Sequence, residues 1–133
     1  MKYYQIDLAS LILRIALGVM FLAHGFTKLF VFTPTGTAQY FQSLGFPSFV
    51  GYLTIMFEIG GGLLLLLGIL TRIISLLAVI QMTVITFIHS VNGWSFSNSG
   101  GGWEYPAFMA LTALSLVLLG SGRFSVLPKY IAY

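Results

Sequence analysis

Long apolar runs dominate the chain, and short polar segments separate them. A helix needs roughly 20 apolar residues to cross about 30 Å of hydrocarbon. Four runs approach this length, at residues 8–32, 49–70, 73–89 and 105–119. The pattern predicts an all-α fold: one transmembrane four-helix bundle over residues 1–133, in which the first span is retained rather than cleaved as a signal peptide.

The segments between the spans carry their own signals. The stretch "TPTGTAQYFQSLGFP" between the first two spans predicts a short helix that Thr37 caps and that lies in the membrane interface. We expect Asp7 to cap the first span and Pro106 to occupy the first turn of the fourth. The stretch "SVNGWSFSNSGGGWE" is rich in glycine and serine, and its Trp94 and Trp103 are typical of an aromatic belt at a membrane boundary.

Composition supports a membrane protein and excludes several other classes. Hydrophobic residues make up 58% of the chain and charged residues 7%, whereas about 25% of residues are charged in soluble domains. The chain has no cysteine, which excludes a disulfide relay and an iron–sulfur cluster held by its own thiolates. The net charge of +3 is scattered without a basic block, so we expect no nucleic-acid partner.

The basic residues predict the orientation in the membrane. With four spans, most of them fall on one side, whereas Lys28 lies toward the other. By the positive-inside rule, both termini face the cytoplasm. We interpret Arg14 and Arg72 as anchors near the inner boundary. The residues on the predicted inner side are Lys2, Arg14, Arg72, Arg123 and Lys129.

Five ionisable residues fall in the outer half of the predicted spans or at their ends: His24, Lys28, Glu58, His89 and Glu104. Glu58 lies near the middle of the second span, where a carboxylate must be paired, protonated or in contact with water. We expect it to form a polar pocket with His24 and Lys28. His89 and Glu104 would contribute to the outer wall of that pocket.

Simpler readings remain open for three of these residues. Lys28 alone could extend to the lipid headgroups. Glu104 could be an acid favoured at a helix N-terminus, and His89 an ordinary residue at a helix end. The glycines of "EIGGG" share a face with Glu58 and predict close packing against a neighbouring helix.

Four motifs occur in an order that resembles the DoxX family of small bacterial and archaeal membrane proteins. They are "RIALGVMFLAHGFTKLF", "FEIGGGLLLLLGILTR", "IHSVNGW" and "GGGWEYPAFMALTALSLVLLGSGRFS". The resemblance implies four transmembrane helices, a location in the cytoplasmic (inner) membrane and an oxidoreductase role. Relatives include a subunit of a thiosulfate:quinone oxidoreductase and members tied to resistance against quinones, catechols or oxidative stress.

Our first hypothesis is a membrane component of an oxidoreductase or stress-defence system that binds a quinone- or phenol-like molecule. Glu58, His24 and Lys28 would be the catalytic residues: Lys28 and His24 would donate hydrogen bonds to the ligand oxygens, and Glu58 would be the buried proton carrier. A redox partner protein would have to supply electrons. The expected ligand-binding residues are His89, Glu104, Tyr105 and Trp103.

Two other classes remain as alternatives. One is a small permease or an assembly subunit of a membrane complex, in which the chain could form a homo-oligomer. The other is a haem or metal site built from His24, His89, Glu58 and Glu104. The metal alternative is weaker, because no paired-ligand spacing occurs and Lys28 would repel a cation. We therefore expect no metal, and a quinone as the cofactor or substrate.

Overall fold

The computed structural model describes residues 2–127, and in this range all regular structure is helical, as the hydropathy pattern predicts. Lys129 lies outside the described residues. The helices are α1 (Lys2–Phe26), η1 (Thr27–Val31), α2 (Pro34–Ser43), α3 (Ser48–Leu67), α4 (Thr71–His89), η2 (Ser90–Asn92) and α5 (Glu104–Leu119). Of these, η1 is a π-helix and η2 a 3-10 helix.

Three apolar helical segments are long enough to cross a membrane: Tyr3–Val31, Ser48–Leu67 and Thr71–Asn92. The fourth, α5, is also apolar but has 16 residues. Large hydrophobic side chains cover the outside of the bundle, which suits contact with lipid rather than water. The chain is therefore an integral membrane protein.

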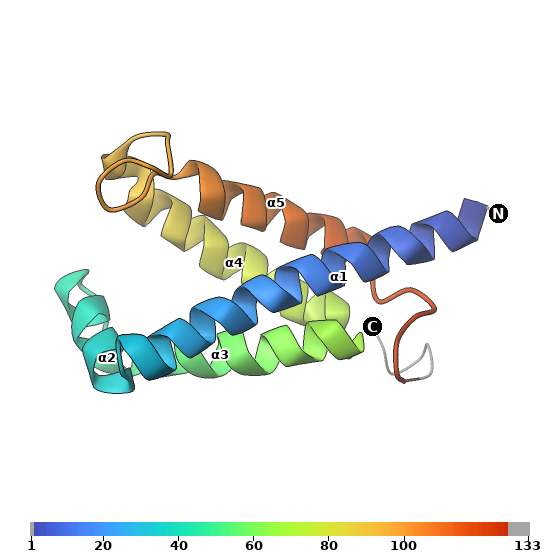
Figure 1. The fold of residues 1–133 in the computed structure, drawn as a ribbon, viewed down its shortest axis with the longest axis horizontal. Helices are drawn as coiled ribbons and strands as arrows, with labels where there is room; N and C mark the ends of the chain where they lie inside the picture. The colour runs from blue at the N-terminus through green and yellow to red at the C-terminus, as the bar shows by residue number, and fades with distance from the viewer. Residues whose placement is uncertain (1, 128–133) are drawn as a thin grey trace.

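The long helices form two pairs, with α1 packed along α3 and α4 packed along α5. Although the chain passes directly from α3 into α4, these two helices make few contacts. Figure 1 shows the two pairs converging near the termini and spreading apart toward α2 and the loop before α5. We call the spread end, with residues 32–47 and 90–103, the loop end. The opposite end, with residues 2–7, 68–70 and 120–127, is the terminal end.

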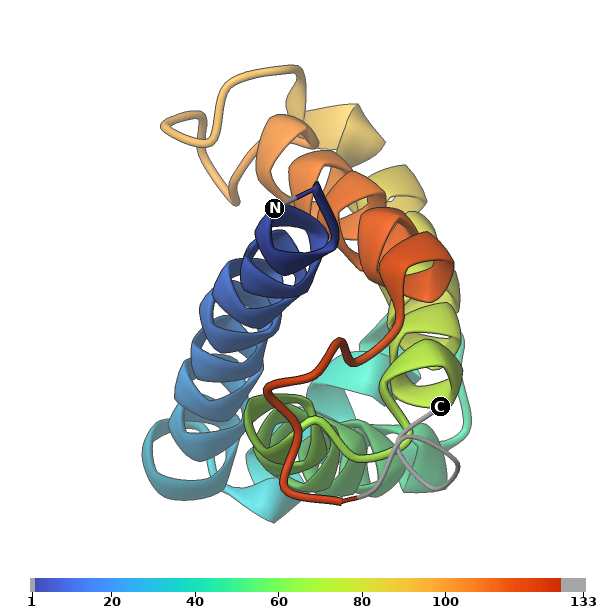
Figure 2. The same ribbon diagram turned by 90° about the vertical axis from the view of Figure 1, so that its right-hand side faces the viewer.

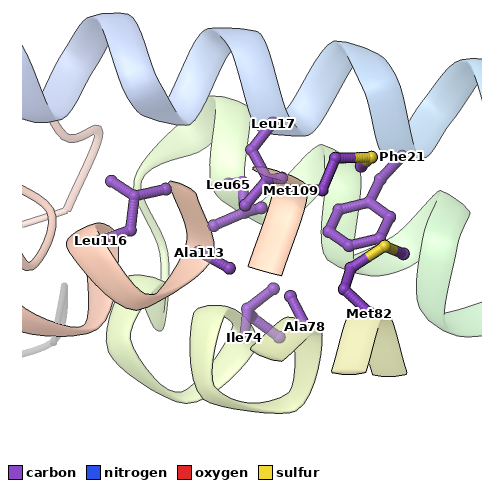
Figure 3. Packing of buried hydrophobic residues seen from close by; sticks show 9 residues of the cluster. All are labelled: Leu17, Phe21, Leu65, Ile74, Ala78, Met82, Met109, Ala113 and Leu116. Atoms are coloured by element: carbon purple, nitrogen blue, oxygen red, sulfur yellow. The ribbon is translucent and has the colours of Figure 1, made fainter. Parts of the chain in front are cut away.

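A compact apolar core joins the two pairs. All four long helices contribute to it, and Figure 3 shows their side chains meeting between the ribbons. Its members are Leu17, Phe21, Leu65, Ile74, Ala78, Met82, Met109, Ala113 and Leu116.

Glycines bring α1 and α3 into close contact. A Cβ atom on Gly62 would lie 2.9 Å from the carbonyl oxygen of Gly18, and one on Gly18 would lie 2.9 Å from that of Gly62. Farther toward the loop end, a Cβ on Gly25 would lie 2.7 Å from the side chain of Ile59 and 3.1 Å from the Cβ of Glu58. The predicted close packing along "EIGGG" is confirmed, since a side chain at these points would force the helices apart.

Both predicted caps of the early helices are wrong. The first helix begins at Lys2, so Asp7 lies within it and bonds to Arg123 through the backbone N–H at 3.1 Å and Nε at 2.7 Å. In α2, the cap is Thr33, whose hydroxyl accepts a hydrogen bond from the backbone N–H of Gly36, because Pro34 starts the helix earlier than expected. Thr37 lies inside α2.

The interpretation of Arg14 as a boundary anchor is also wrong. Its side chain is fully buried at the terminal end, where Nη2 donates a hydrogen bond of 2.6 Å to the carbonyl of Phe124. Gly68 leaves the necessary space, since a Cβ there would overlap the guanidinium. Figure 2 shows the segment after α5 crossing this end of the bundle, and the hydroxyl of Ser10 donates to Gly120 at its start.

Candidate functional site

A cavity of about 1120 Å³ lies between the helix pairs on the side of the loop end. Its wall is mostly apolar and comes from α1, η1, α2, α3, α4 and α5. Several lining residues of α3 and α4 are also exposed at the surface, among them Leu53, Ile80 and Val84. The cavity is therefore open rather than enclosed, and we call it the Glu58 cavity.

Glu58 lies in the wall of this cavity with 1% of its surface exposed. Lys28 donates to both of its carboxylate oxygens, at 3.1 Å to Oε1 and 2.9 Å to Oε2. Gln81 Nε2 donates to Oε1 at 2.7 Å. The predicted polar partner from another helix is thus present, and the acid has two partners, one from η1 and one from α4.

The close approach of α1 to α3 and the π-helix η1 together position Lys28. In η1, the backbone N–H of Phe32 bonds to the carbonyl of Thr27 at 3.1 Å, five residues earlier. The hydroxyl of Thr37 donates to the carbonyl of Lys28 at 3.3 Å and so ties α2 to this turn. π-Helical turns of this kind are frequent at functional sites. With 18% of its side chain exposed, Lys28 retains a small accessible surface.

Gln81 was missed in the sequence analysis, which considered ionisable residues. A signal was available, because Gln81 is an amide in the middle of the apolar helix α4. A polar side chain at that depth needs a hydrogen-bonding partner. The hydrogen bond from Gln81 to Glu58 links α4 to α3, and these two helices otherwise make few contacts.

His24 lines the same cavity, but the hydrogen bonds described for residues 2–127 do not join it to Glu58 or Lys28. Its ring stacks with Tyr105 at a centroid distance of 6.2 Å and an interplanar angle of 16°. The hydroxyl of Tyr105 donates to the sulfur of Met20 at 3.3 Å. The two rings form an aromatic part of the wall between α1 and α5.

His89 also lines the Glu58 cavity, at the end of α4. Its Nδ1 lies 2.9 Å from the carbonyl oxygen of Gly101, which also accepts a hydrogen bond from Asn92 Nδ2 at 2.8 Å. These contacts hold the long loop before α5, residues 93–103, against the end of α4. They also fix the orientation of the imidazole ring.

Glu104 and Trp103 lie elsewhere. They line a second, smaller cavity on the outer side of α5 and are not part of the wall of the Glu58 cavity. Tyr105 belongs to both walls. The structure thus brings Glu58, Lys28, His24 and His89 to one cavity and directs Glu104 to another.

Three residues of the metal alternative, His24, Glu58 and His89, line the Glu58 cavity, and Glu104 does not. Within residues 2–127, no group of three or more histidine, cysteine, aspartate or glutamate side chains is arranged to hold a metal ion.

Comparisons with known proteins show the family of the chain. The model of the DoxX family matches residues 9–91. The chain is 34% identical to "Putative oxidoreductase CatD" of Bacillus subtilis (strain 168) over 125 residues, covering 94% of this chain and 88% of the relative. It is 30% identical to "Inner membrane protein YqjF" of Escherichia coli (strain K12) over 125 residues, covering 90% of each. No solved structure matches the chain at a significant level. With a family match over most of its length and relatives that align almost end to end, the chain belongs to the DoxX family.

Proposed function

We propose that this protein is the membrane component of an oxidoreductase or of a quinone, catechol or oxidative-stress defence system, and that it binds a quinone- or phenol-like molecule in the Glu58 cavity. The name of the Bacillus relative supports an oxidoreductase-associated role. The ligand class rests on the cavity itself.

The observation that carries the proposal is the hydrogen-bonded group of Lys28, Glu58 and Gln81 in a wall that is otherwise apolar. Small-molecule sites are typically apolar cavities with a few polar groups that orient the ligand. A quinone or phenol would match such a cavity, since its ring is apolar and its polar oxygens lie at the edge of the ring. Since α3 and α4 make few contacts, we infer that such a molecule enters the cavity between these two helices, directly from the lipid.

The polar group offers suitable chemistry for the oxygens of the ligand. Lys28 has three N–H donors and Gln81 has two, so each retains a donor after its bond to Glu58. A ligand oxygen could accept from one of them, while the carboxyl group of Glu58 takes up or releases a proton. Reduction of a quinone requires two electrons and two protons. We assign the electrons to a reduced redox partner protein and both protons to water, passed to the ligand oxygens one at a time through Glu58.

His24 and Tyr105 would contribute from the part of the wall formed by α1 and α5. Their stacked rings offer a flat aromatic surface for the ligand ring, and the imidazole of His24 can also donate or accept a hydrogen bond. His89, held by Gly101, would contact the ligand near the loop end.

A binding cavity fits the packing better than a path across the bundle. Toward the terminal end, the space between the helix pairs is filled by the apolar core that includes Phe21, Met82 and Met109 (Figure 3). A permease would need an opening through this layer. The remaining alternative is an assembly subunit, which would not bind the ligand, and a binding experiment distinguishes the two roles.

The proposal is tested by ligand binding and by protection of cells. Purified protein is titrated with a short-chain ubiquinone analogue, and bound ligand is counted by native mass spectrometry. The charge-neutral double variant Glu58→Gln/Lys28→Met should bind about tenfold more weakly or worse, because it loses a charged hydrogen bond worth about 1.5–3 kcal/mol. Cells that depend on this protein should lose resistance to catechol or quinone when they carry the double variant.

Leu118→Ala is the matched control, since Leu118 is 73% exposed on α5 and lines neither cavity. This variant should bind the analogue as the parent does. If the double variant is made at normal levels, binds the analogue normally and protects cells fully, the proton-handling site is wrong and the assembly-subunit reading gains support.

A further inference from the structure

The long loop brings the two tryptophans of the chain together beside an acid. The backbone N–H of Trp103 bonds to the carbonyl of Gly93 at 3.1 Å, and that of Glu104 bonds to the carbonyl of Trp94 at 3.2 Å. These bonds align the two loop segments side by side. The indole rings of Trp94 and Trp103 meet edge to face at a centroid distance of 4.6 Å and an angle of 84°.

Glycine makes this pairing possible. A Cβ on Gly102 would lie 2.3 Å from the carbonyl oxygens of both Ser95 and Trp94, so the two segments could not approach with any side chain there. The preceding Gly101 adopts φ 78°, a conformation that disfavours other residues. The aromatic pair is thus held by backbone geometry rather than by flexible side chains alone.

The pair forms part of a cavity of about 440 Å³ on the outer side of α5, which we call the tryptophan cavity. One end is aromatic and acidic, and the other is apolar. Its lining residues are Trp94, Trp103, Glu104, Tyr105, Ala107, Phe108 and Leu111.

The charged group at the aromatic end is the carboxylate of Glu104. Glu104 Oε1 accepts a hydrogen bond of 3.3 Å from the backbone N–H of Phe96. The ion pairs described within residues 2–127 join other residues, Lys28 with Glu58 and Arg123 with Asp7. A carboxylate in the same wall as aromatic rings is an arrangement that can bind alkylammonium groups, because both attract the cation. A ligand with an ammonium group would therefore complement this end of the cavity.

The apolar end indicates what else the ligand contains. Phe108 and Leu111 are 69% and 63% exposed and continue the cavity along the lipid-facing side of α5. Tryptophans are typical of the headgroup level of a membrane. We propose that the tryptophan cavity binds a phospholipid with an ammonium headgroup, such as phosphatidylethanolamine, with the ammonium against Glu104 and the indoles and an acyl chain along Phe108 and Leu111.

Because Trp94 and Trp103 are the two tryptophans of the chain, intrinsic fluorescence reports on this site directly. The protein is placed in nanodiscs of phosphatidylglycerol with increasing fractions of phosphatidylethanolamine. We expect a saturating change in tryptophan emission for the parent and for Leu118→Ala, and at least a fivefold weaker response for Glu104→Gln. Soluble ethanolamine added to phosphatidylglycerol nanodiscs should have no comparable effect, because it lacks the acyl chain.

Native mass spectrometry of the parent protein provides a test that needs no variant. From an equimolar mixture of the two lipids, phosphatidylethanolamine should be retained preferentially on the protein. Equal retention of the two lipids, or the same fluorescence response in Glu104→Gln as in the parent, would overturn the proposal. A response to soluble ethanolamine as strong as that to the lipid would overturn the lipid as the source of the ammonium group.

Discussion

At the level of single residues, the hydrogen bonds of Glu58 explain how an acid is accommodated near the middle of a membrane helix. Lys28 supplies a compensating charge, and Gln81 supplies a neutral donor from another helix. Desolvation makes such an ion pair costly to form, but removal of one partner is worse, since the remaining charge is left alone. The three residues should therefore behave as one unit in mutation experiments.

This view predicts a non-additive effect on stability. Glu58→Gln alone leaves Lys28 without its counter-charge, and Lys28→Met alone leaves a buried carboxylate, so each should lower the free energy of unfolding by about 3–5 kcal/mol. The double variant removes both charges and should be closer to the parent than either single variant. Thermal unfolding of the four proteins in detergent measures this. Effects of the two single variants that simply add would contradict a coupled pair.

Sequence reasoning identified Glu58 and Lys28 because a charge within an apolar span is conspicuous. It missed Gln81 because a neutral amide is less so, and it misread Arg14 because a cation near a predicted boundary normally reaches the headgroups. The space for Arg14 depends on Gly68 and on the returning segment at Phe124, which are distant from it in the sequence.

At the level of elements, the glycine contact between α1 and α3 places Lys28 within reach of Glu58. The contact is backbone against backbone, since Gly18 and Gly62 each lie against the carbonyl of the other. Such close packing stabilises membrane helices through van der Waals contact rather than through exclusion of water.

Two glycines of α3 offer a matched comparison. In Gly62→Ala, the new methyl group would lie 2.9 Å from the backbone of α1, which cannot move aside as a flexible side chain could. In Gly60→Ala, the methyl group meets nothing within 4 Å. We expect the first variant to lose about 1–3 kcal/mol of stability and the second to be neutral or slightly stabilised. Equal unfolding temperatures in a thermal-shift assay would contradict the close approach of α1 to α3.

The short elements were harder to predict than the long ones. Hydropathy predicts α3 and α4 well, because lipid demands long apolar helices. It does not predict the π-helix η1, because a widened helical turn does not change the pattern of hydrophobic residues. The start of α2 depends on Thr33 and Pro34 rather than Thr37, a choice between nearby caps that the local sequence does not decide.

At the level of the whole molecule, the pairing of α1 with α3 and of α4 with α5 creates the Glu58 cavity. Hydropathy alone does not specify this pairing, since all four helices are apolar and any two could be neighbours. The spread between α3 and α4 at the loop end is therefore a property of the assembled bundle (Figure 1).

The orientation of the bundle is a further prediction. Arg14, Arg72 and Arg123 lie at or near the terminal end, and by the positive-inside rule we expect both termini to face the cytoplasm. The chain lacks cysteine, so single cysteines introduced at Thr35 and Asn98 give unambiguous labels. Both should react with an impermeant thiol reagent in intact cells. Labelling that appears only after lysis would reverse the assignment.

The central claim, that the Glu58 cavity binds a quinone-like molecule, is tested most directly by photolabelling. The protein in nanodiscs is irradiated with a photoreactive quinone, and the labelled peptides are mapped by mass spectrometry. We predict saturable labelling around Leu53, Phe57, Ile80 and Val84, which an unlabelled short-chain quinone prevents and which the Glu58→Gln/Lys28→Met variant largely loses. Labelling spread over the outer faces of all helices, or unaffected by the competitor, would contradict it.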